Sequence, residues 1–376
     1  ADRVDRLPVR LCCLSATIRR RGTVRQVIPQ TEPERIDPGL FDAVCIGETM
    51  ASFVETDDPR YYVAIAAGAE SNVAIGLARL GRRTQWVSRI GDDPLGRIVE
   101  ESVASAGVTV SATRDPDRVT GVMVKHPSGP AKVSSYYRSQ SAARLLSPDD
   151  LVRVGRAPWV HLTGITPALS ESAHALVRSV IDRKSDLDCR VSFDVNYRSK
   201  LWPDAAAAAD TVLPLARNAD VVFIGDDEAH ILFGTESESA LAHLILRRAD
   251  QELVLKRGPG DASVVTIDGE ITVSALATSV VDVTGAGDAF VAGYLAARSD
   301  EWPAEARLRL GHFMAARVVG SLEDVPPPLT DEELTLISPA WLSSLWNDGR
   351  VSTEIPSVES SGHRTSNPTS QEGHRS

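Results

Sequence analysis

The stretch Asp282-Val283-Thr284-Gly285-Ala286-Gly287-Asp288-Ala289-Phe290 holds the residues best suited to chemistry. It follows the β-branched pair Val280-Val281 and precedes small, helix-forming residues, so it is expected to carry the chain from a strand into a helix. Gly285 and Gly287 leave backbone N–H groups free to face an anion at a helix N-terminus. A carboxylate beside such an anion hole, Asp288, can accept a proton from a hydroxyl that attacks a phosphoryl group. The stretch indicates phosphoryl transfer, and its alternative is a capped helix after an ordinary tight turn.

Two further segments place polar side chains before a helix and at the end of an expected hairpin. Gly68-Ala69-Glu70-Ser71-Asn72 precedes an apolar helix pattern, where an Asn amide can hold sugar hydroxyls. The alternative role of this segment is a helix cap. Tyr136 and Arg138 close the hairpin, and a guanidinium suits bidentate binding of a carboxylate. The alternative for Arg138 is a surface position beside two aromatic residues of an edge strand.

Three segments follow directly on expected buried strands, whose carboxyl ends form the ligand-binding edge of an open α/β sheet. Arg198, which follows residues 190–194, could hold a substrate carboxylate or phosphates, or form a structural salt bridge. Glu228 could reach Mg²⁺ through water, although acids in a first helical turn also complement the helix dipole. Residues 256–261 form a tight turn that could wrap a nucleotide, and the alternative is an ordinary loop.

Composition limits the classes of function. The chain has 376 residues, 43% of them hydrophobic, which is enough for one large or two ordinary domains. Its formal net charge of −11 excludes a general basic surface, so nucleic acid is not expected as a partner. A local cationic pocket for an anionic substrate is compatible with this balance. Positive charge comes almost wholly from arginine, so the few lysines, Lys256 among them, are of interest.

Cysteine usage and the lack of long apolar runs favour a cytoplasmic protein. Cys12, Cys13, Cys45 and Cys189 match neither a Cys-x-x-Cys metal pair nor a disulfide framework, which indicates a reducing compartment. No apolar run approaches the roughly 18 residues of a membrane helix. The leader with Arg19-Arg20-Arg21 lacks the apolar region of a secretory signal. We expect an unstructured extension there, with a targeting peptide as the alternative.

Strand and helix patterns alternate along most of the chain, which predicts a parallel sheet covered by helices. Strands are expected at residues 41–46, 61–65, 85–90, 159–162, 190–194, 221–224 and 253–256. Helices are expected at residues 73–80, 95–106, 170–183, 204–217, 226–233, 237–248, from 289 onward, 304–320 and 331–345. A hairpin at residues 262–267 and 270–275 is expected to lead into the Gly-rich stretch.

The alternation breaks between residues 118 and 138, where segments 122–125 and 133–137 flank a turn at 127–130 and predict a β-hairpin. Together with strands within about residues 50–65, this hairpin is expected to form a small separate sheet, a lid over the main domain. The main domain is expected to span residues 41–345. Residues 1–40 and 346–376 are polar and without periodicity, so they are expected to be disordered.

Other catalytic motifs are missing from the sequence. No His-x-x-x-His pair falls on a plausible helix, so a zinc site is unsupported. The chain has no Gly-x-Ser-x-Gly elbow and no Walker Gly-Lys-Ser/Thr. No Gly-x-Gly-x-x-Gly follows the first strand, which disfavours a Rossmann dehydrogenase. Any nucleotide therefore has to use the turn at Gly285 and Gly287.

The Gly-rich stretch closely resembles the signature of the ribokinase-like (PfkB) carbohydrate kinases. The resemblance covers about residues 41–340 and includes Gly68, Asn72-Val73-Ala74 and Leu80-Gly81 as well as residues 282–293. Within that family the chain is most similar to 2-dehydro-3-deoxygluconate (KDG) kinases. The strings behind this similarity are Gly47-Glu48-x-Met50, residues 68–72, Tyr136-Tyr137-Arg138 with residues 141–143, residues 161–169, residues 194–198 with Leu201-Trp202, and Leu255-Lys256-Arg257-Gly258.

Such kinases transfer the γ-phosphoryl group of ATP to the terminal hydroxyl of a keto-deoxy sugar acid, which for KDG gives 2-dehydro-3-deoxy-6-phosphogluconate. The resemblance implies a ribokinase-like α/β/α sandwich with a β-sheet lid, ATP and Mg²⁺ as cofactors, an optional monovalent cation, and a homo-oligomer paired through lid strands. It implies Asp288 as the base and Gly285, Ala286 and Gly287 as the anion hole. The implied substrate-binding residues are Gly68, Ala69, Glu70, Asn72, Tyr136, Arg138, Arg198, Asp288 and Asp324. The implied ATP-binding residues are Asn196, Arg198, Lys256, Arg257, Gly258, Gly260, Gly285 and Gly287, with Glu228 near Mg²⁺.

Three positions depart from the family pattern. Ala67-Gly68 replaces the usual Gly-Gly, and Gly225-Asp226-Asp227-Glu228 keeps only the acid of an Asn-x-x-Glu motif. Met123 replaces a lid Tyr that touches substrate in some KDG kinases, which leaves the sugar acid, gluconate- or galactonate-derived, open. The expected function is a KDG kinase. The alternatives are a fructokinase or other neutral-sugar kinase, and a catalytically silent sugar-acid-binding protein.

Overall fold

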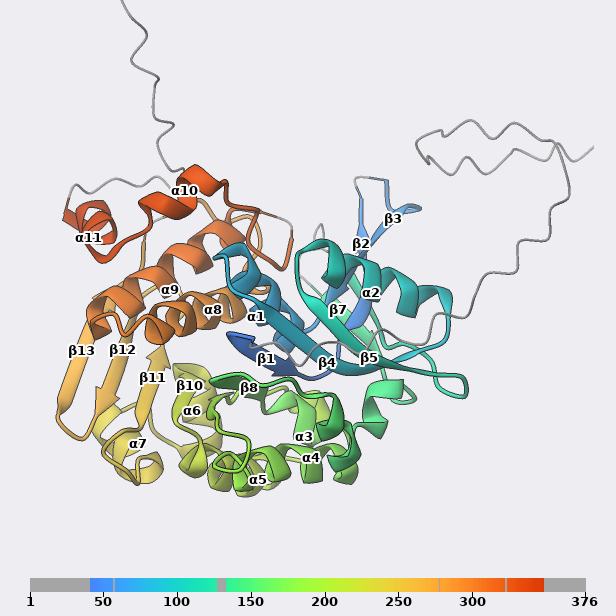
Figure 1. Ribbon diagram of the computed structural model, residues 1–376, viewed down its shortest axis with the longest axis horizontal. Helices are drawn as coiled ribbons and strands as arrows, with labels where there is room; N and C mark the ends of the chain where they lie inside the picture. Colours follow the sequence, from blue (N-terminus) through green and yellow to red (C-terminus); the bar gives the residue numbers. More distant parts are fainter. Residues whose placement is uncertain (1–40, 57, 127–132, 277, 322, 348–376) are drawn as a thin grey trace, which may run out of the picture. The chain divides into compact units, whose positions relative to one another are not determined.

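A large central sheet organises the part of the chain that the structure describes (Figure 1). The computed structural model describes residues 41–347 except 57, 127–132, 277 and 322, all within a unit that spans Pro38–Ser376. The strands of the sheet are β1 (Ala43–Ile46), β4 (Thr84–Gly91), β5 (Thr109–Asp115), β8 (Trp159–Thr163), β9 (Arg190–Asp194), β10 (Val221–Gly225), β11 (Glu252–Lys256), β12 (Asp261–Thr266) and β13 (Gly269–Ser274).

Within these described ranges the strand order is β13-β12-β11-β10-β9-β8-β1-β4-β5. Every neighbouring pair from β5 to β11 is parallel, whereas β12 and β13 add an antiparallel hairpin at one edge. Strands in the middle are buried on both faces, which is why they have continuous apolar runs such as Val-Val-Phe-Ile in β10. Parallel strands bring their carboxyl ends to one edge, so the polar residues that follow β9, β10 and β11 meet there.

Helices cover both faces of the sheet (Figure 1). One face carries α1 (Ala69–Arg79), α2 (Pro94–Ser105), α8 (Ala286–Ser299) and α9 (Ala304–Val319). The other carries α3 (Ile165–Leu169), α4 (Glu171–Asp182), α5 (Ala205–Asn218), α6 (Asp226–Phe233) and α7 (Glu238–Ile245). Each helical layer packs its own cluster of buried apolar side chains against the strands. The predicted ribokinase-like α/β/α sandwich is therefore confirmed.

A smaller sheet is formed by β2 (Met50–Glu55), β3 (Tyr62–Ala67), β6 (Val122–His126) and β7 (Val133–Tyr137), in the order β3-β2-β6-β7. The predicted hairpin is present as the antiparallel pair β6 and β7, and its expected turn at 127–130 lies outside the described residues. The two segments expected to be disordered, 1–40 and 346–376, also lie outside them apart from residues 346 and 347. We call this four-stranded part the lid sheet.

The sequence-based expectation of a strand before the Gly-rich turn is wrong. Residues 278–284 are irregular, and Val280, Val281 and Val283 are exposed by 64%, 43% and 61%. β-branched residues alone do not make a strand when no neighbouring strand is placed to pair with them. The long helix expected at 331–345 is also two helices, α10 (Asp331–Leu336) and α11 (Pro339–Asn347), because Pro339 cannot continue a preceding helix.

Two helices begin earlier than their apolar patterns suggest. α1 starts at Ala69 because the polar residues Glu70, Ser71 and Asn72 are buried in its first turn rather than exposed ahead of it. α8 starts at Ala286, inside the Gly-rich stretch. Both shifts bring the polar residues of these stretches into helical first turns. Among the described residues no helix has the length and apolar character needed to cross a membrane.

Candidate active site

The Gly-rich turn ends in the N-terminus of α8, which carries no side-chain cap among the described residues. Gly285 is the N-cap and has a φ of +80°, a left-handed conformation that favours glycine. A Cβ at Gly285 would also collide with the backbone carbonyl of Asp324. The Cα of Gly287 faces a more open space, where the position of a Cβ would lie 3.7 Å from Nζ of Lys256. The turn is thus shaped to present backbone N–H groups and a nearby ammonium to an anion.

Asp288 is the third residue of α8 and is buried, with an exposed fraction of 9%. The amide Nδ2 of Asn72 donates to Oδ2 of Asp288 at 2.8 Å, and Nδ2 of Asn196 lies 3.4 Å from Oδ1. Burial raises the pKa of Asp288 to about 7, and the negative charge of Asp194 adds to this shift, while the donor Asn72, Arg198 and Lys256 oppose it. A carboxyl group with such a pKa can exchange protons near neutral pH.

We expect kcat/KM to rise as the pH increases through about 7, because only the ionised form of Asp288 can accept a proton. Replacing Asn72 by Ala removes a donor that favours the ionised form, so the profile should shift to higher pH. The measurement is the pH dependence of kcat/KM for the acceptor between about pH 5.5 and 9, at saturating ATP. A profile without an inflection in this range would contradict the role of Asp288 as base.

Lys256 lies at the end of β11 beside a group of acids. Its Nζ donates to both carboxylate oxygens of Asp194 at 2.8 and 3.0 Å. Asp194 is the last residue of β9, which is separated from β11 by β10. Burial alone would lower the pKa of Lys256, but the charges of Asp194 and Glu228 outweigh it and raise the pKa. The ammonium is therefore charged, and it lies between the acids and the Gly-rich turn.

Glu228 is held in place by two backbone donors. Its Oε1 accepts from the N–H of Tyr197 at 2.7 Å and its Oε2 from the N–H of Gly225 at 2.8 Å. Burial, reinforced by the negative charge of Asp194, raises the pKa of Glu228. Arg198 lies 3.9 Å from Oε1 and its side chain is 50% exposed, so it remains available to a ligand. In the described ranges no group of three or more His, Cys, Asp or Glu side chains is arranged to hold a bare metal ion.

The backbone is strained where β9 leads into this site. Asn196 has a φ of +41°, which is uncommon for a residue other than glycine. This conformation lets the Asn196 side chain reach Asp288 while the next N–H, of Tyr197, reaches Glu228. Such outliers persist where the surrounding contacts determine them, and they cluster at functional sites.

The lid sheet contributes Arg138 and Tyr136. The Arg138 side chain is 10% exposed and forms an ion pair with the buried Glu48, which follows β1. The Tyr136 ring is exposed by 42%, and Nζ of Lys200 lies 5.8 Å from its centroid. Arg138 therefore sits inside the molecule and Tyr136 at its surface, and both lie on the same short segment of the lid.

Glu70 does not point toward Asp288 but toward the end of β8. Its Oε1 accepts from the hydroxyls of Thr163 and Thr166, each at 2.7 Å, and its carboxylate fills the space that a side chain at Gly47 would need. Burial raises the pKa of Glu70, and the two threonine donors and Arg138 oppose that shift. Glu70 thus joins α1 to β1 and β8, which keeps Asn72 of the same helix in position.

The two basic side chains of segment 256–261 point in different directions. Lys256 faces the site, whereas Arg257 forms ion pairs with Glu238 of α7 and with Asp261 at 2.7 Å. Gly258 has a φ of +50°, and the N–H of Gly260 donates to the carbonyl of Arg257 at 2.8 Å, which closes the tight turn. Arg257 is thus held by two acids, and its contact with ATP stays a prediction.

Sequence reasoning missed several polar residues of the site. Lys125 of β6, which reaches Asp282 and Asp324, had no predicted role. Thr163 and Thr166, which hold Glu70, belong only to a longer predicted string, and the same is true of Asp194 and Glu48. The scarcity of lysine was a usable signal for Lys125, since a lysine in an otherwise apolar strand pattern is unusual. No local pattern pointed to its partners, which are far away along the chain.

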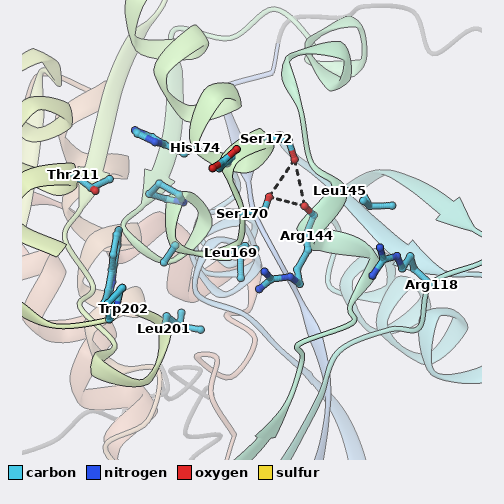
Figure 2. A pocket seen from close by; sticks show the side chains of 14 residues that line it. Arg118, Arg144, Leu145, Leu169, Ser170, Ser172, His174, Leu201, Trp202 and Thr211 are labelled. Carbon is cyan, nitrogen blue, oxygen red and sulfur yellow. Dashed lines mark hydrogen bonds between the residues drawn. The ribbon is translucent and has the colours of Figure 1, made fainter. Parts of the chain in front are cut away.

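A separate hollow of about 670 Å³ lies beside the start of α4 (Figure 2). It is lined by Arg118, Arg144, Leu145, residues 167–172, His174, residues 201–203 and Thr211. Figure 2 shows Ser170 and Ser172 directed at the backbone of Arg144, and the hydroxyl of Ser170 donates to the Arg144 carbonyl at 2.6 Å. The lining includes none of the predicted site residues, and the serines are already satisfied, so this hollow is distinct from the site around Asp288.

Known proteins are similar to this chain over most of its length. A model of the pfkB family carbohydrate kinases matches residues 41–330. The 2-dehydro-3-deoxygluconokinase of Bacillus subtilis is 33% identical over 306 residues, which cover 78% of this chain and 94% of that protein. The 2-dehydro-3-deoxygluconokinase of Thermoproteus tenax is 35% identical over 312 residues, with coverage of 78% and 94%. Among solved structures, a PfkB protein from Polaromonas sp. JS666 superposes with a TM-score of 0.67 at 29% identity, covering 75% of this chain and 97% of that one.

Proposed function

Since the chain belongs to the pfkB family of carbohydrate kinases, we propose that it transfers the γ-phosphoryl group of ATP to the terminal hydroxyl of 2-dehydro-3-deoxy-D-gluconate (KDG). The product would be 2-dehydro-3-deoxy-6-phosphogluconate, as in metabolism of the Entner–Doudoroff type. The observation that carries the proposal is a buried carboxyl group, Asp288, at the N-terminus of α8, which has no side-chain cap in the described part of the chain. The names of the two 2-dehydro-3-deoxygluconokinases support the choice of acceptor.

Asp288 would orient the acceptor hydroxyl and take its proton as the phosphoryl group is transferred in line. Asn72 and Asn196 hold the carboxylate from two sides, so its geometry is set before the substrate binds. A pKa of about 7 suits this role, because the group is ionised in a large part of the molecules at neutral pH yet basic enough to accept a proton.

The Gly-rich turn would bind the γ-phosphate through the backbone at Gly285, Ala286 and Gly287. Negative charge that builds on the transferred group would be balanced by the α8 dipole and by the ammonium of Lys256. Asn196, Arg198, Gly258 and Gly260 complete the expected ATP contacts, and Arg257 would support the turn from its outer side.

Mg²⁺ neutralises phosphate charge in such transfers when it is bound with ATP. The acids present fit a hydrated ion better than a bare one, because each Glu228 oxygen already accepts a backbone hydrogen bond. Glu228 would therefore contact the ion through water.

The other cofactor raised by the sequence is a monovalent cation, and a Vibrio cholerae fructokinase of similar fold was solved with fructose, ADP and a potassium ion. In this chain Lys125 already places a positive charge beside the Gly-rich turn. We therefore propose activity without an added monovalent cation.

The acceptor would lie between the lid sheet and the carboxyl ends of the strands. Gly68, Ala69 and Asn72 would contact its hydroxyls, and Tyr136 would cover it. The substrate carboxylate would bind Arg138 and Arg198, where Arg138 is already oriented by Glu48. Glu70 and Asp324 would support these substrate contacts indirectly, Glu70 through its hydrogen bond from Thr163 and Asp324 through its ion pair with Lys125.

We expect the purified protein to release ADP fastest with KDG in a panel that also contains its galactonate-derived epimer, fructose and ribose. Replacing Arg138 by Ala should lower kcat/KM for KDG by about 10²-fold or more and affect fructose far less. The carboxylate of KDG would lose its guanidinium partner, whereas fructose has no carboxylate. The assay is coupled ADP release at saturating MgATP.

Arg138→Ala also leaves Glu48 buried without its cation, which is destabilising in general. The double variant Arg138→Ala/Glu48→Gln removes that charge and serves as the matched control. Equal losses for KDG and fructose in both variants would remove Arg138 from carboxylate recognition. A wild-type protein that prefers fructose would favour the main alternative, a neutral-sugar kinase, for which a Klebsiella pneumoniae fructokinase at 32% identity is the relevant relative.

A silent sugar-acid-binding protein is the alternative of another class, and any ATP turnover that depends on the sugar would exclude it. The exposed aromatic residues at the edges of the lid sheet, Tyr61, Tyr62 and Tyr137, support the proposal of a homo-oligomer paired through the lid. Light scattering of the full chain would test it. A reaction between ATP and a small sugar acid also fits the cytoplasmic location expected from the sequence.

A further inference from the structure

Lys125 is a buried lysine of the lid sheet that the proposed reaction does not use directly. Its side chain is 5% exposed, and its Nζ lies 2.5 Å from Oδ1 of Asp324 and 2.9 Å from Oδ2 of Asp282. The two carboxylates are exposed by only 2% and 9%. One ammonium therefore bridges two buried acids that come from different parts of the chain.

Both acids lie next to the Gly-rich turn, Asp282 at its start and Asp324 against Gly285. Asp282 is the first residue of the stretch, and its Oδ1 accepts from the N–H and the hydroxyl of Thr284 at 3.1 and 3.0 Å. Asp324 contributes the backbone carbonyl that packs directly against Gly285. Lys125 thus connects the segment that begins the turn to the segment that supports it from behind.

The charges explain why this bridge matters. Burial raises the pKa of Asp324, and the lysine opposes that shift, while hydrogen bonds from Lys125 and Thr284 lower the pKa of Asp282. Burial would also lower the pKa of Lys125, but the two carboxylates raise it overall, so the lysine is charged. Without the ammonium, two like charges would face each other in a buried place and push the walls of the turn apart.

We propose that Lys125 is a positioning residue that fixes the anion hole from the lid sheet. Its ammonium holds Asp282 and Asp324 together and so keeps Gly285 in the left-handed conformation that presents the backbone N–H groups. Because Lys125 belongs to β6, the same two ion pairs fix the position of the anion hole relative to the lid sheet. This inference rests on the proposed role of the turn in phosphoryl transfer.

The test is Lys125→Met, which removes the charge and keeps most of the length of the side chain. We expect kcat to fall by about 10²-fold or more, with a smaller change in the KM for ATP, because the loss concerns the transition state. Ammonium or methylammonium chloride, added to a buffer with choline as the only other cation, should restore at least about a tenth of the lost kcat by occupying the vacated space between the acids.

Lys184→Met is the matched control, because Lys184 forms an ion pair with Asp220 at the other end of the strands, at 2.6 Å. It should lower the melting temperature without a change in kcat and without any response to ammonium. A purely structural Lys125 would behave in the same manner. Lys125→Met with wild-type kcat, or with a lost kcat that ammonium leaves unchanged in folded protein, would overturn the proposal.

If Lys125→Met does not fold, the double variant Lys125→Met/Asp324→Asn keeps the test decisive. It leaves one buried carboxylate, Asp282, which retains the Thr284 donors, so we expect it to fold. Its kcat should stay low, because removing the repulsion does not restore the ammonium that links Asp282 to residue 324, and a wild-type kcat would refute the proposal. Failure of the proposed function is seen separately: if the wild type prefers another sugar of the panel, the same comparison is made with that sugar.

Discussion

Replacing Asp288 by Asn is expected to lower kcat by about 10³- to 10⁴-fold, the upper part of the range of about 10²- to 10⁴-fold that general-base catalysis supplies. The amide has nearly the same shape as the carboxylate but cannot take the proton of the acceptor hydroxyl. It also loses its charge, so the donors of Asn72 and Asn196 no longer face an anion. ATP affinity should stay within about threefold, because the backbone of the Gly-rich turn and Lys256 remain in place.

The measurement combines single-turnover kinetics with calorimetric titration of a non-hydrolysable ATP analogue. Asp300→Asn is the matched control, since Asp300 is the C-cap of the same helix and pairs with Arg82 at the surface. That variant should keep wild-type kcat. A near-normal rate for Asp288→Asn, or an equal effect of both variants on kcat, would contradict the assignment of Asp288 as base.

Gly285→Ala is expected to cause the second largest loss, about 10²- to 10³-fold in kcat, comparable to the removal of one donor from an oxyanion hole. A Cβ at this position strains the left-handed backbone, at a cost of about 1 to 2 kcal/mol, and collides with the carbonyl of Asp324. The turn can relieve the collision only by moving away from Asp324, which displaces the N–H groups that would bind the phosphate. ADP affinity should fall less than kcat, because ADP lacks the γ-phosphate that the turn would bind.

Gly81→Ala separates strain from collision. Gly81 has a φ of +76°, close to that of Gly285, but a Cβ there meets no atom within 4 Å. This control should lose about 1 to 2 kcal/mol of stability and no activity. If Gly285→Ala shows only the same stability loss, with normal kcat, the anion hole does not depend on the conformation of Gly285. The measurements are thermal unfolding, kcat and ADP titration for both variants.

The parts of the fold that follow from local pattern were predictable. β9, β10 and β11 are short strands in which every residue but one at an end is buried, and their predicted ranges differ from the observed ones by no more than the terminal residue. Val280 and Val281 repeat the Val-Val pair that begins β10, but they are exposed, and no strand among the described residues pairs with them. Residue type alone therefore did not distinguish a strand from an irregular segment, because a strand requires a partner.

The sequence by itself determined that Asp288 follows a glycine turn at a helix N-terminus, because these features are set by residues adjacent along the chain. Only the tertiary structure decided how Asp288 behaves as an acid: burial raises its pKa, and its donor Asn72 lies 216 residues away. The same holds for Lys125, whose partner Asp324 is 199 residues away. Desolvation and charge pairing depend on which groups lie close together in the folded chain, and the order of residues along the sequence does not show this.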